Sequence, residues 1–140
     1  MEQQEYKTLR EIDVKPFIEK KGQLTYLSWA KAWDLLKQQY PNATYTIYEN
    51  EQGYPYFHDG KWAWVKVGVT IQDLEHKMIL PVMNNMNKSI PLEMIDMNVI
   101  NKTIMRCLAK AIAMHGIGLS LYIGEDLQES HSNTMNYRRT

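Results

Sequence analysis

The stretch WAWVKVGVTI, residues 62–71, alternates between two kinds of position with the period of a β-strand. One face would carry only small or branched apolar side chains: Ala63, Val65, Val67, Val69 and Ile71. The opposite face would carry a mixed set: Trp62, Trp64, Lys66, Gly68 and Thr70. Because successive side chains of a strand point to opposite sides of the sheet, the first set is expected to pack on a core and the second to form an outer face.

The segments on either side of this strand predict an antiparallel meander. Residues 43–49 alternate in the same way and are rich in β-branched and aromatic residues, which favour strands. Residues 50–60 contain two glycines and a proline and are expected to form a loop. After a short turn near Gln72 and Asp73, residues 75–83 predict the third strand. Three consecutive strands at this spacing are typical of a meander.

Two helices are predicted from apolar residues at helical spacing. The first covers residues 28–40, with Ser28 as its capping residue and Pro41 as its stop. The second covers residues 96–115 and is followed by Gly116, which suits the left-handed residue that often ends a helix. Its buried stripe is expected to consist of Met97, Ile100, Ile104, Leu108, Ala111 and Ile112.

The order helix, three strands, long helix predicts an α+β domain with helices packed on an antiparallel sheet. About the first twenty residues are expected to form an irregular or strand-like lead-in, with Pro16 and Gly22 as breaks. With 140 residues, 44% of them hydrophobic, the chain fits one domain with its own core. We expect this domain to cover residues 1–127 and residues 128–140 to form a short mobile tail.

Cysteine usage and the distribution of apolar residues predict a cytoplasmic protein. Cys107 is the single cysteine, so no intramolecular disulfide can form, which suits a reducing compartment. No apolar run approaches the roughly 20 residues that a membrane span needs. Residues 1–17 carry scattered charges and lack the apolar centre of a signal peptide.

A row of basic residues on the second helix is the main candidate for a binding site. Lys102, Arg106 and Lys110 follow one another at intervals of four, which places them in one slowly drifting row beside the apolar stripe. The row spans about 12 Å of helix, enough to reach two neighbouring phosphates of an extended strand. Such contacts give affinity for nucleic acid that does not depend on base sequence. The alternative is a solvated basic face, but after Asp96 this helix has no Glu or Asp that could neutralise the row.

The outer face of the central strand is a second candidate. Trp62 and Trp64 precede Lys66, and aromatic surface beside a cation can hold stacked bases and their backbone. The alternative is that a helix or a neighbouring subunit covers the two tryptophans. Sixteen basic residues balance sixteen acidic ones, so nucleic-acid binding would depend on where the cations lie and not on the net charge.

Motifs for enzymatic chemistry are absent, and we expect no catalytic residue, metal site or cofactor. No glycine-rich phosphate loop followed by Lys-Ser/Thr is present, so ATP use has no visible basis. The four histidines lack metal-ligand spacing. Glu125 and Asp126 form one adjacent acidic pair, which is too few carboxylates for the metals of a nuclease. Cys107 has no neighbouring base and is expected to be a buried structural thiol.

Four segments resemble the Sak-like single-strand annealing proteins of Gram-positive phages and mobile elements, which are distantly akin to the eukaryotic Rad-fifty-two annealing protein. These segments are LTYLSWAKAWDLLKQQYPNATY, WVKVGVTI, LPVMNNMNKSI and RCLAKAIAMHGIGLSLYIGEDL. The resemblance covers about residues 24–127, and the last segment is its most specific part.

This resemblance implies a three- or four-stranded antiparallel sheet backed by the long helix, in subunits arranged side by side as rings or helical filaments. It implies ATP-independent pairing of complementary DNA strands in recombination and repair, with the single strand held by its backbone and no cofactor consumed. Arg106 and Lys110 match positions where the wider superfamily places basic DNA contacts, Lys66 is a looser match, and Lys102 rests on spacing alone. The further partners it suggests are the host single-strand-binding protein and a phage exonuclease. The first of these is the weaker expectation, because only a short segment follows Leu127.

A different class of function fits the same residues. Tryptophan-rich surfaces are typical of protein-binding hot spots, so the chain could instead be a small phage or mobile-element product that binds a host or repressor protein.

Overall fold

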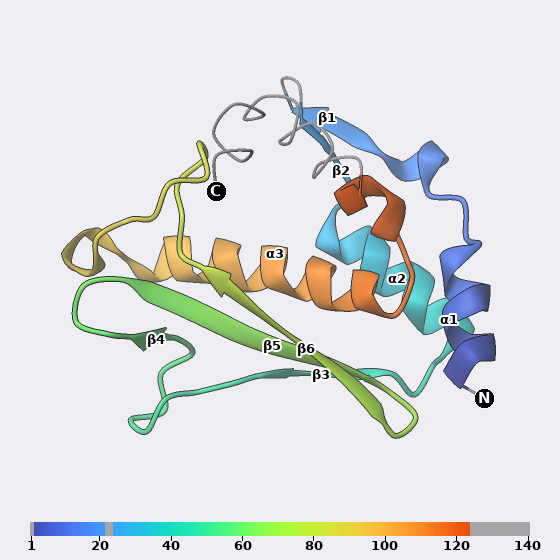
Figure 1. Cartoon of the computed structure of the whole chain (residues 1–140), viewed down its shortest axis with the longest axis horizontal. Helices are drawn as coiled ribbons and strands as arrows, with labels where there is room; N and C mark the ends of the chain where they lie inside the picture. The colour runs from blue at the N-terminus through green and yellow to red at the C-terminus, as the bar shows by residue number, and fades with distance from the viewer. Residues whose placement is uncertain (1, 22–23, 124–140) are drawn as a thin grey trace, which may run out of the picture.

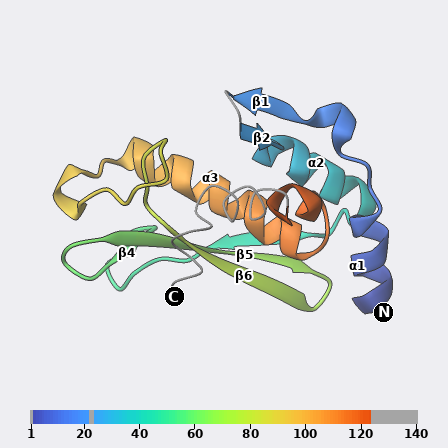
Figure 2. The ribbon, with the colours of Figure 1, turned by 45° about the horizontal axis from the view of Figure 1, so that its top comes forward.

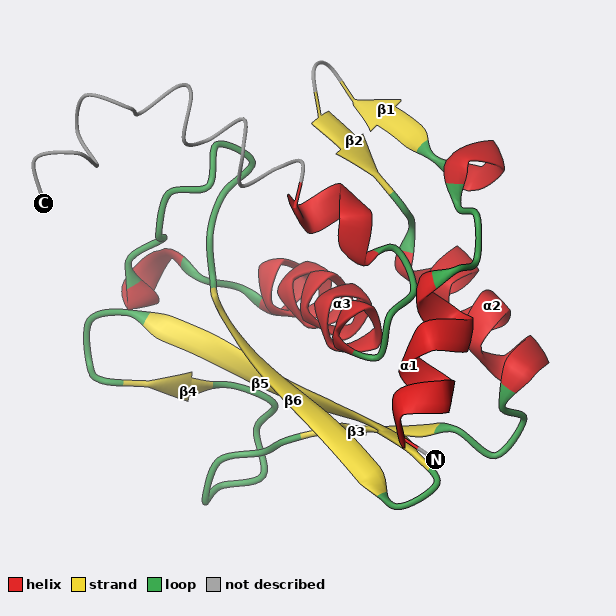
Figure 3. Ribbon diagram, turned by 45° about the vertical axis from the view of Figure 1, so that its right-hand side comes forward, coloured by secondary structure: helices red, strands yellow, loops and turns green. Residues whose placement is uncertain are grey.

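The protein is built of an antiparallel sheet with helices on one of its faces, which confirms the predicted α+β class (Figures 1 and 2). The computed structural model describes residues 2–21 and 24–123. In all three ribbon views the long helix lies along one side of the main sheet, and no described helix covers the other side (Figure 3). The sheet therefore has an inner face, toward the helices, and an outer face.

The main sheet is organised around its longest strand, β5 (Ala63–Ile71). β6 (Leu74–Pro81) pairs with β5 along nearly its whole length. β3 (Thr44–Ile47) and the short β4 (Phe57–His58) share the other edge of β5. All of these pairs are antiparallel, so the predicted three-strand meander is confirmed, and β4 is an addition within the predicted loop.

The core lies between β5 and the long helix α3 (Met97–Met114). Every alternate residue of β5 from Ala63 to Ile71 is buried, as its pattern predicts. The buried partners from the predicted stripe of α3 are Ile100, Ile104, Leu108, Ala111 and Ile112. The prediction for Met97 is wrong: its side chain is 57% exposed, because α3 begins there, one turn before its first buried residue.

The two predicted helix starts carry the side-chain caps that the sequence suggests. At the start of α2 (Trp29–Gln39), Ser28 Oγ accepts a hydrogen bond of 3.2 Å from the backbone N–H three residues on. At the start of α3, Asp96 Oδ1 accepts a bond of 2.9 Å in the same way. Each bond satisfies a donor that the first helical turn leaves unpaired.

The N-terminal segment corrects the prediction of an irregular or strand-like lead-in. It contains α1 (Glu2–Arg10), the 3-10 helix η1 (Lys15–Phe17) and a hairpin of β1 (Glu19–Lys21) and β2 (Leu24–Tyr26). The hairpin is strand-like, but α1 was missed. Its sequence has little apolar periodicity, and Leu9, which is fully buried, joins the core through tertiary packing.

Within residues 2–21 and 24–123, no helix has both the length and the apolar character needed to cross a membrane. The predicted tail, residues 128–140, and the pair Glu125–Asp126 lie outside the described residues.

Candidate nucleic-acid interface

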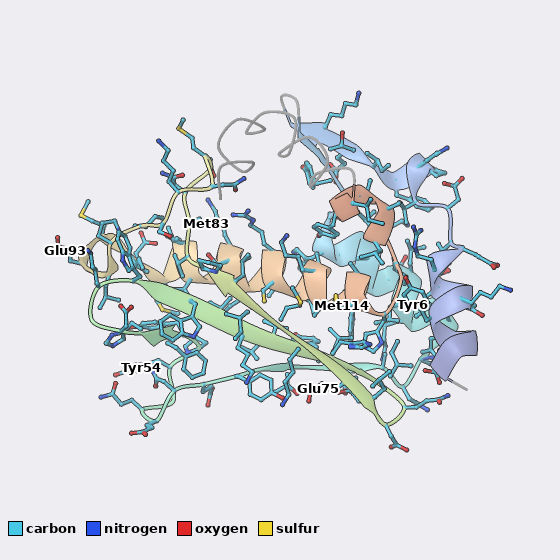
Figure 4. The ribbon with its side chains drawn as sticks, in the orientation of Figure 1. Tyr6, Tyr54, Glu75, Met83, Glu93 and Met114 are labelled. Carbon is cyan, nitrogen blue, oxygen red and sulfur yellow. The ribbon has the colours of Figure 1, made fainter. Side chains whose placement is uncertain are left out.

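A groove of about 380 Å³ lies between α3, β6 and the segments that follow each of them. Its apolar lining is rich in methionine and consists of Met78, Leu80, Met83, Ala113, Met114 and Leu119. The remainder of the lining consists of Asn87, Arg106, Lys110 and Tyr122. Figure 4 shows Met83, which follows β6, and Met114, the last residue of α3, well apart from one another. The groove thus combines apolar surface with two cations from one helix.

The two cations come from successive turns of α3, about 6 Å apart along its axis. Arg106 Nη2 donates a hydrogen bond to Asn87 Oδ1 at 3.2 Å, and the Lys110 ammonium lies 4.5 Å from the centre of the Tyr122 ring. In the described part of the chain, neither cation has a carboxylate within ion-pair distance. A polyanion entering the groove would therefore meet positive charge that no described acidic side chain neutralises.

Lys102 lies on the same helix, one turn before Arg106, and its side chain is exposed. It does not line the groove. The structure therefore brings Arg106 and Lys110 together and leaves the third member of the predicted row on the adjacent surface.

The sequence model of the Sak single-strand annealing proteins matches residues 4–138, nearly the whole chain. The chain belongs to the Sak single-strand annealing protein family. Neither the curated proteins nor the solved structures contain a match to it. Family membership confirms the expected resemblance and, with it, a role in single-strand annealing.

The other predicted DNA contacts of this Sak-family protein lie on the opposite side of the sheet. Trp62, Trp64 and Lys66 alternate with the buried residues of β5 and so belong to the outer face. Trp64 stacks on Phe57 with ring centres 6.4 Å apart, and the Lys66 ammonium lies 5.0 Å from the centre of the Tyr48 ring. The sheet separates these side chains from the groove, so within one chain the two sets cannot line a single site.

Positive charge on the outer face has an acidic neighbour. The Tyr48 hydroxyl donates to the Glu75 carboxylate at 2.6 Å, and Lys77 lies 4.0 Å from the same carboxylate. That carboxylate lies directly over Gly68, where an added Cβ would come within 1.9 Å of it. The hydrogen bond to Glu75 raises the pKa of Tyr48. In Figure 4, Glu75 lies on the side of the sheet away from α3. This carboxylate lowers the local positive potential of the outer face.

Cys107, the single cysteine, has the surroundings of a structural and not of a catalytic residue. Cys107 is buried, as expected, and its thiol donates to the Met78 carbonyl oxygen at 3.3 Å. Burial raises the pKa of this thiol to about 11, so it is not poised as a nucleophile. Within the described ranges, no cluster of three or more His, Cys, Asp or Glu side chains could hold a metal ion.

Sequence reasoning missed the residues that surround the two cations in this Sak-family protein. Asn87 lies in a segment expected to be a polar loop, and Tyr122 follows the end of the long helix. Only tertiary contacts bring them to Arg106 and Lys110. One signal was available: the run NNMNKS, residues 84–89, has the asparagine content of a tight turn.

Proposed function

We propose that this protein binds single-stranded DNA in the groove between α3 and β6 and pairs it with a complementary strand without consuming ATP. The observation that carries the proposal is the pair Arg106 and Lys110, two cations on successive helical turns with no described carboxylate beside them. Family membership supplies the class of substrate, since the family is one of single-strand annealing proteins.

The groove suits a strand held by its backbone. Phosphates would contact Arg106 and Lys110 and release their condensed counterions, which favours binding whatever the base sequence. The apolar lining beside the cations would contact sugars or base edges. Pairing itself releases about 1.4 kcal/mol per base-pair step, so the protein need only reduce the repulsion between two strands and keep bases accessible. No catalytic group is required for this role.

One groove offers few phosphate contacts, and the chain has a formal net charge of zero. We therefore propose that adjoining copies, in a ring or filament, extend the groove into one track, because linked weak contacts raise the overall affinity. In such an assembly, Trp62, Trp64 and Lys66 would belong to a different surface from the track. Their contact with DNA, like that of Lys102, stays a prediction.

The double substitution Arg106→Ala/Lys110→Ala tests the groove. Loss of two phosphate contacts should weaken single-strand binding at least tenfold at low salt and reduce the slope of log Kd against log salt by about 1.4 per bound chain. Binding is measured by fluorescence anisotropy with a single-stranded oligonucleotide, and annealing with two complementary labelled strands. Lys15→Ala/Lys20→Ala is the matched control, because it removes the same charge from exposed residues outside the groove.

If the double variant binds and anneals DNA as the wild-type protein does, with an unchanged salt slope, the groove is not the DNA site. Absence of any single-strand retention by the wild-type protein at low salt would favour the other class of function, binding of a host or repressor protein.

A further inference from the structure

The turn between β6 and α3 is built to hold one conformation. Asn84 Oδ1 accepts hydrogen bonds from the backbone N–H groups of Met86, at 2.8 Å, and Lys88, at 3.1 Å. The Asn84 backbone N–H donates to the Lys88 carbonyl oxygen at 2.8 Å, and that of Asn87 donates to Asn84 at 3.0 Å. Figures 1 and 3 show this connection rising beside α3. Residues 84–88 therefore form a pre-ordered turn and not a loose loop.

The turn reaches the groove through Asn87. Its backbone has a φ of +60°, a left-handed conformation that costs energy for residues other than glycine, although asparagine tolerates it better than most. In this conformation its side chain lines the groove and accepts the hydrogen bond from Arg106. A guanidinium on a long exposed side chain is otherwise free to rotate, so this bond fixes its direction.

Met86, beside Asn87, presents apolar surface to solvent. Its side chain is 74% exposed, the largest value among the exposed large hydrophobic residues of the described chain. An apolar side chain on an ordered turn loses its contact with water only when a ligand covers it. Lys88 follows on the same turn and is also exposed.

We propose that residues 84–88 form a base-contacting element of the DNA groove, in which Asn87 positions Arg106 and Met86 inserts between neighbouring bases of the bound strand. This inference rests on the proposed function and deepens it. Apolar side chains inserted between bases unstack them. The charge of the turn fits this ligand, since residues 82–91 contain Lys88 and no acidic residue.

Fluorescence of 2-aminopurine placed between adenines in a single-stranded oligonucleotide tests the insertion, because this base brightens when it unstacks. The wild-type protein should raise the fluorescence. Met86→Ala should abolish the rise and weaken binding by about fivefold, and Met86→Leu should keep both. The matched control is Met94→Ala in η2 (Leu92–Met94), because Met94 is 70% exposed, like Met86, but lies outside the turn of residues 84–88.

The insertion is overturned if wild type gives no rise, if Met86→Ala gives the wild-type rise, or if Met94→Ala loses it equally. A lower oligomeric mass for Met86→Ala with unchanged fluorescence would assign this side chain to a neighbouring copy and would also overturn the proposal.

A double-mutant cycle tests the role of Asn87. Asn87→Gly keeps the left-handed backbone and removes the acceptor, so it should weaken single-strand binding by about threefold in the wild-type background. In the Arg106→Ala background it should have no further effect, because Asn87 acts through that guanidinium. Equal losses in both backgrounds would mean a general structural role and overturn the positioning.

The DNA site and the role of the turn can be overturned separately. If Arg106→Ala/Lys110→Ala binds DNA normally, the proposed site is wrong. If that variant is impaired while the Met86 and Asn87 variants behave as wild type, only the turn loses its role.

Discussion

Arg106 and Lys110 are oriented by neutral groups, whereas Lys77 on the outer face lies beside a carboxylate. The amide of Asn87 and the ring of Tyr122 hold the two groove cations without cancelling their charge. Lys77 lies 4.0 Å from Glu75. A phosphate that binds in the groove therefore replaces water and does not have to displace a described acidic side chain.

His115 is the residue whose titration should be visible in the stability of the protein. It is buried at the end of α3, where its Nε2 donates to the Val69 carbonyl oxygen at 2.7 Å and its ring centre lies 4.4 Å from that of His76. Burial lowers the pKa of His115 below its ordinary value. As the pH falls, the unfolded chain therefore takes up this proton before the folded chain does.

The free energy of unfolding should consequently decrease below about pH 6.5, the ordinary histidine value. The contribution of neutral His115 is complete above that pH and is lost as the pH falls toward the lowered pKa of the folded state. Denaturant unfolding at several pH values from neutral to mildly acidic measures the effect. His115→Gln, whose amide can still donate to Val69, should show a weaker pH dependence; equal curves for the two proteins would contradict the assignment.

At the scale of elements, α1 depends on its contact with the end of α3. Gly116 has a φ of +130°, and a Cβ there would lie 2.8 Å from the backbone nitrogen of Arg10 and 3.0 Å from the carbonyl oxygen of Tyr6. Both are backbone atoms of α1, so they cannot move aside as a side chain could. The glycine therefore serves two purposes: it takes a positive φ, and it lets α1 approach closely.

Gly116→Ala should destabilise the protein by about 3 kcal/mol or more, because backbone strain and steric overlap with α1 add together. Amide hydrogen exchange should increase most in α1. Gly53→Ala is the control, since Gly53 also has a positive φ, +85°, but an added Cβ would meet nothing within 4 Å. That variant should lose only about 1 kcal/mol. If denaturant unfolding shows the same loss of unfolding free energy in both variants, contact with α1 does not contribute.

The elements predicted from sequence are those whose own residues carry a periodic pattern. β5 alternates cleanly, and α3 repeats its apolar residues at helical spacing, so burial and pattern agree. α1 could not be predicted, because its packing partner lies more than a hundred residues away. The same holds for the candidate site. Spacing along one helix predicts Arg106 and Lys110, but only the folded chain brings Asn87 to Arg106.

At the scale of the whole molecule, the sheet separates two surfaces with different charge balance. The groove carries two cations, Arg106 and Lys110, without described carboxylate partners, and the outer face mixes Lys66 and Lys77 with Glu75. A chain with zero formal charge therefore has no general attraction for DNA, and its affinity must come from where its cations are placed. Repetition of the groove in neighbouring copies is the way such a chain could hold a long strand firmly.

Salt dependence measured on oligonucleotides of increasing length tests that repetition. Two phosphate contacts per chain, at Arg106 and Lys110, give a slope of about 1.4 in log Kd against log salt. If the grooves of adjoining copies join end to end, a strand that spans two chains should show about twice that slope, and one that spans three about three times, because each contact releases its own counterion. Arg106→Ala/Lys110→Ala should keep a shallow slope at every length. A slope that stays constant with length, in a protein whose sedimentation shows an oligomer, would mean that the grooves are apart and that each copy binds DNA alone.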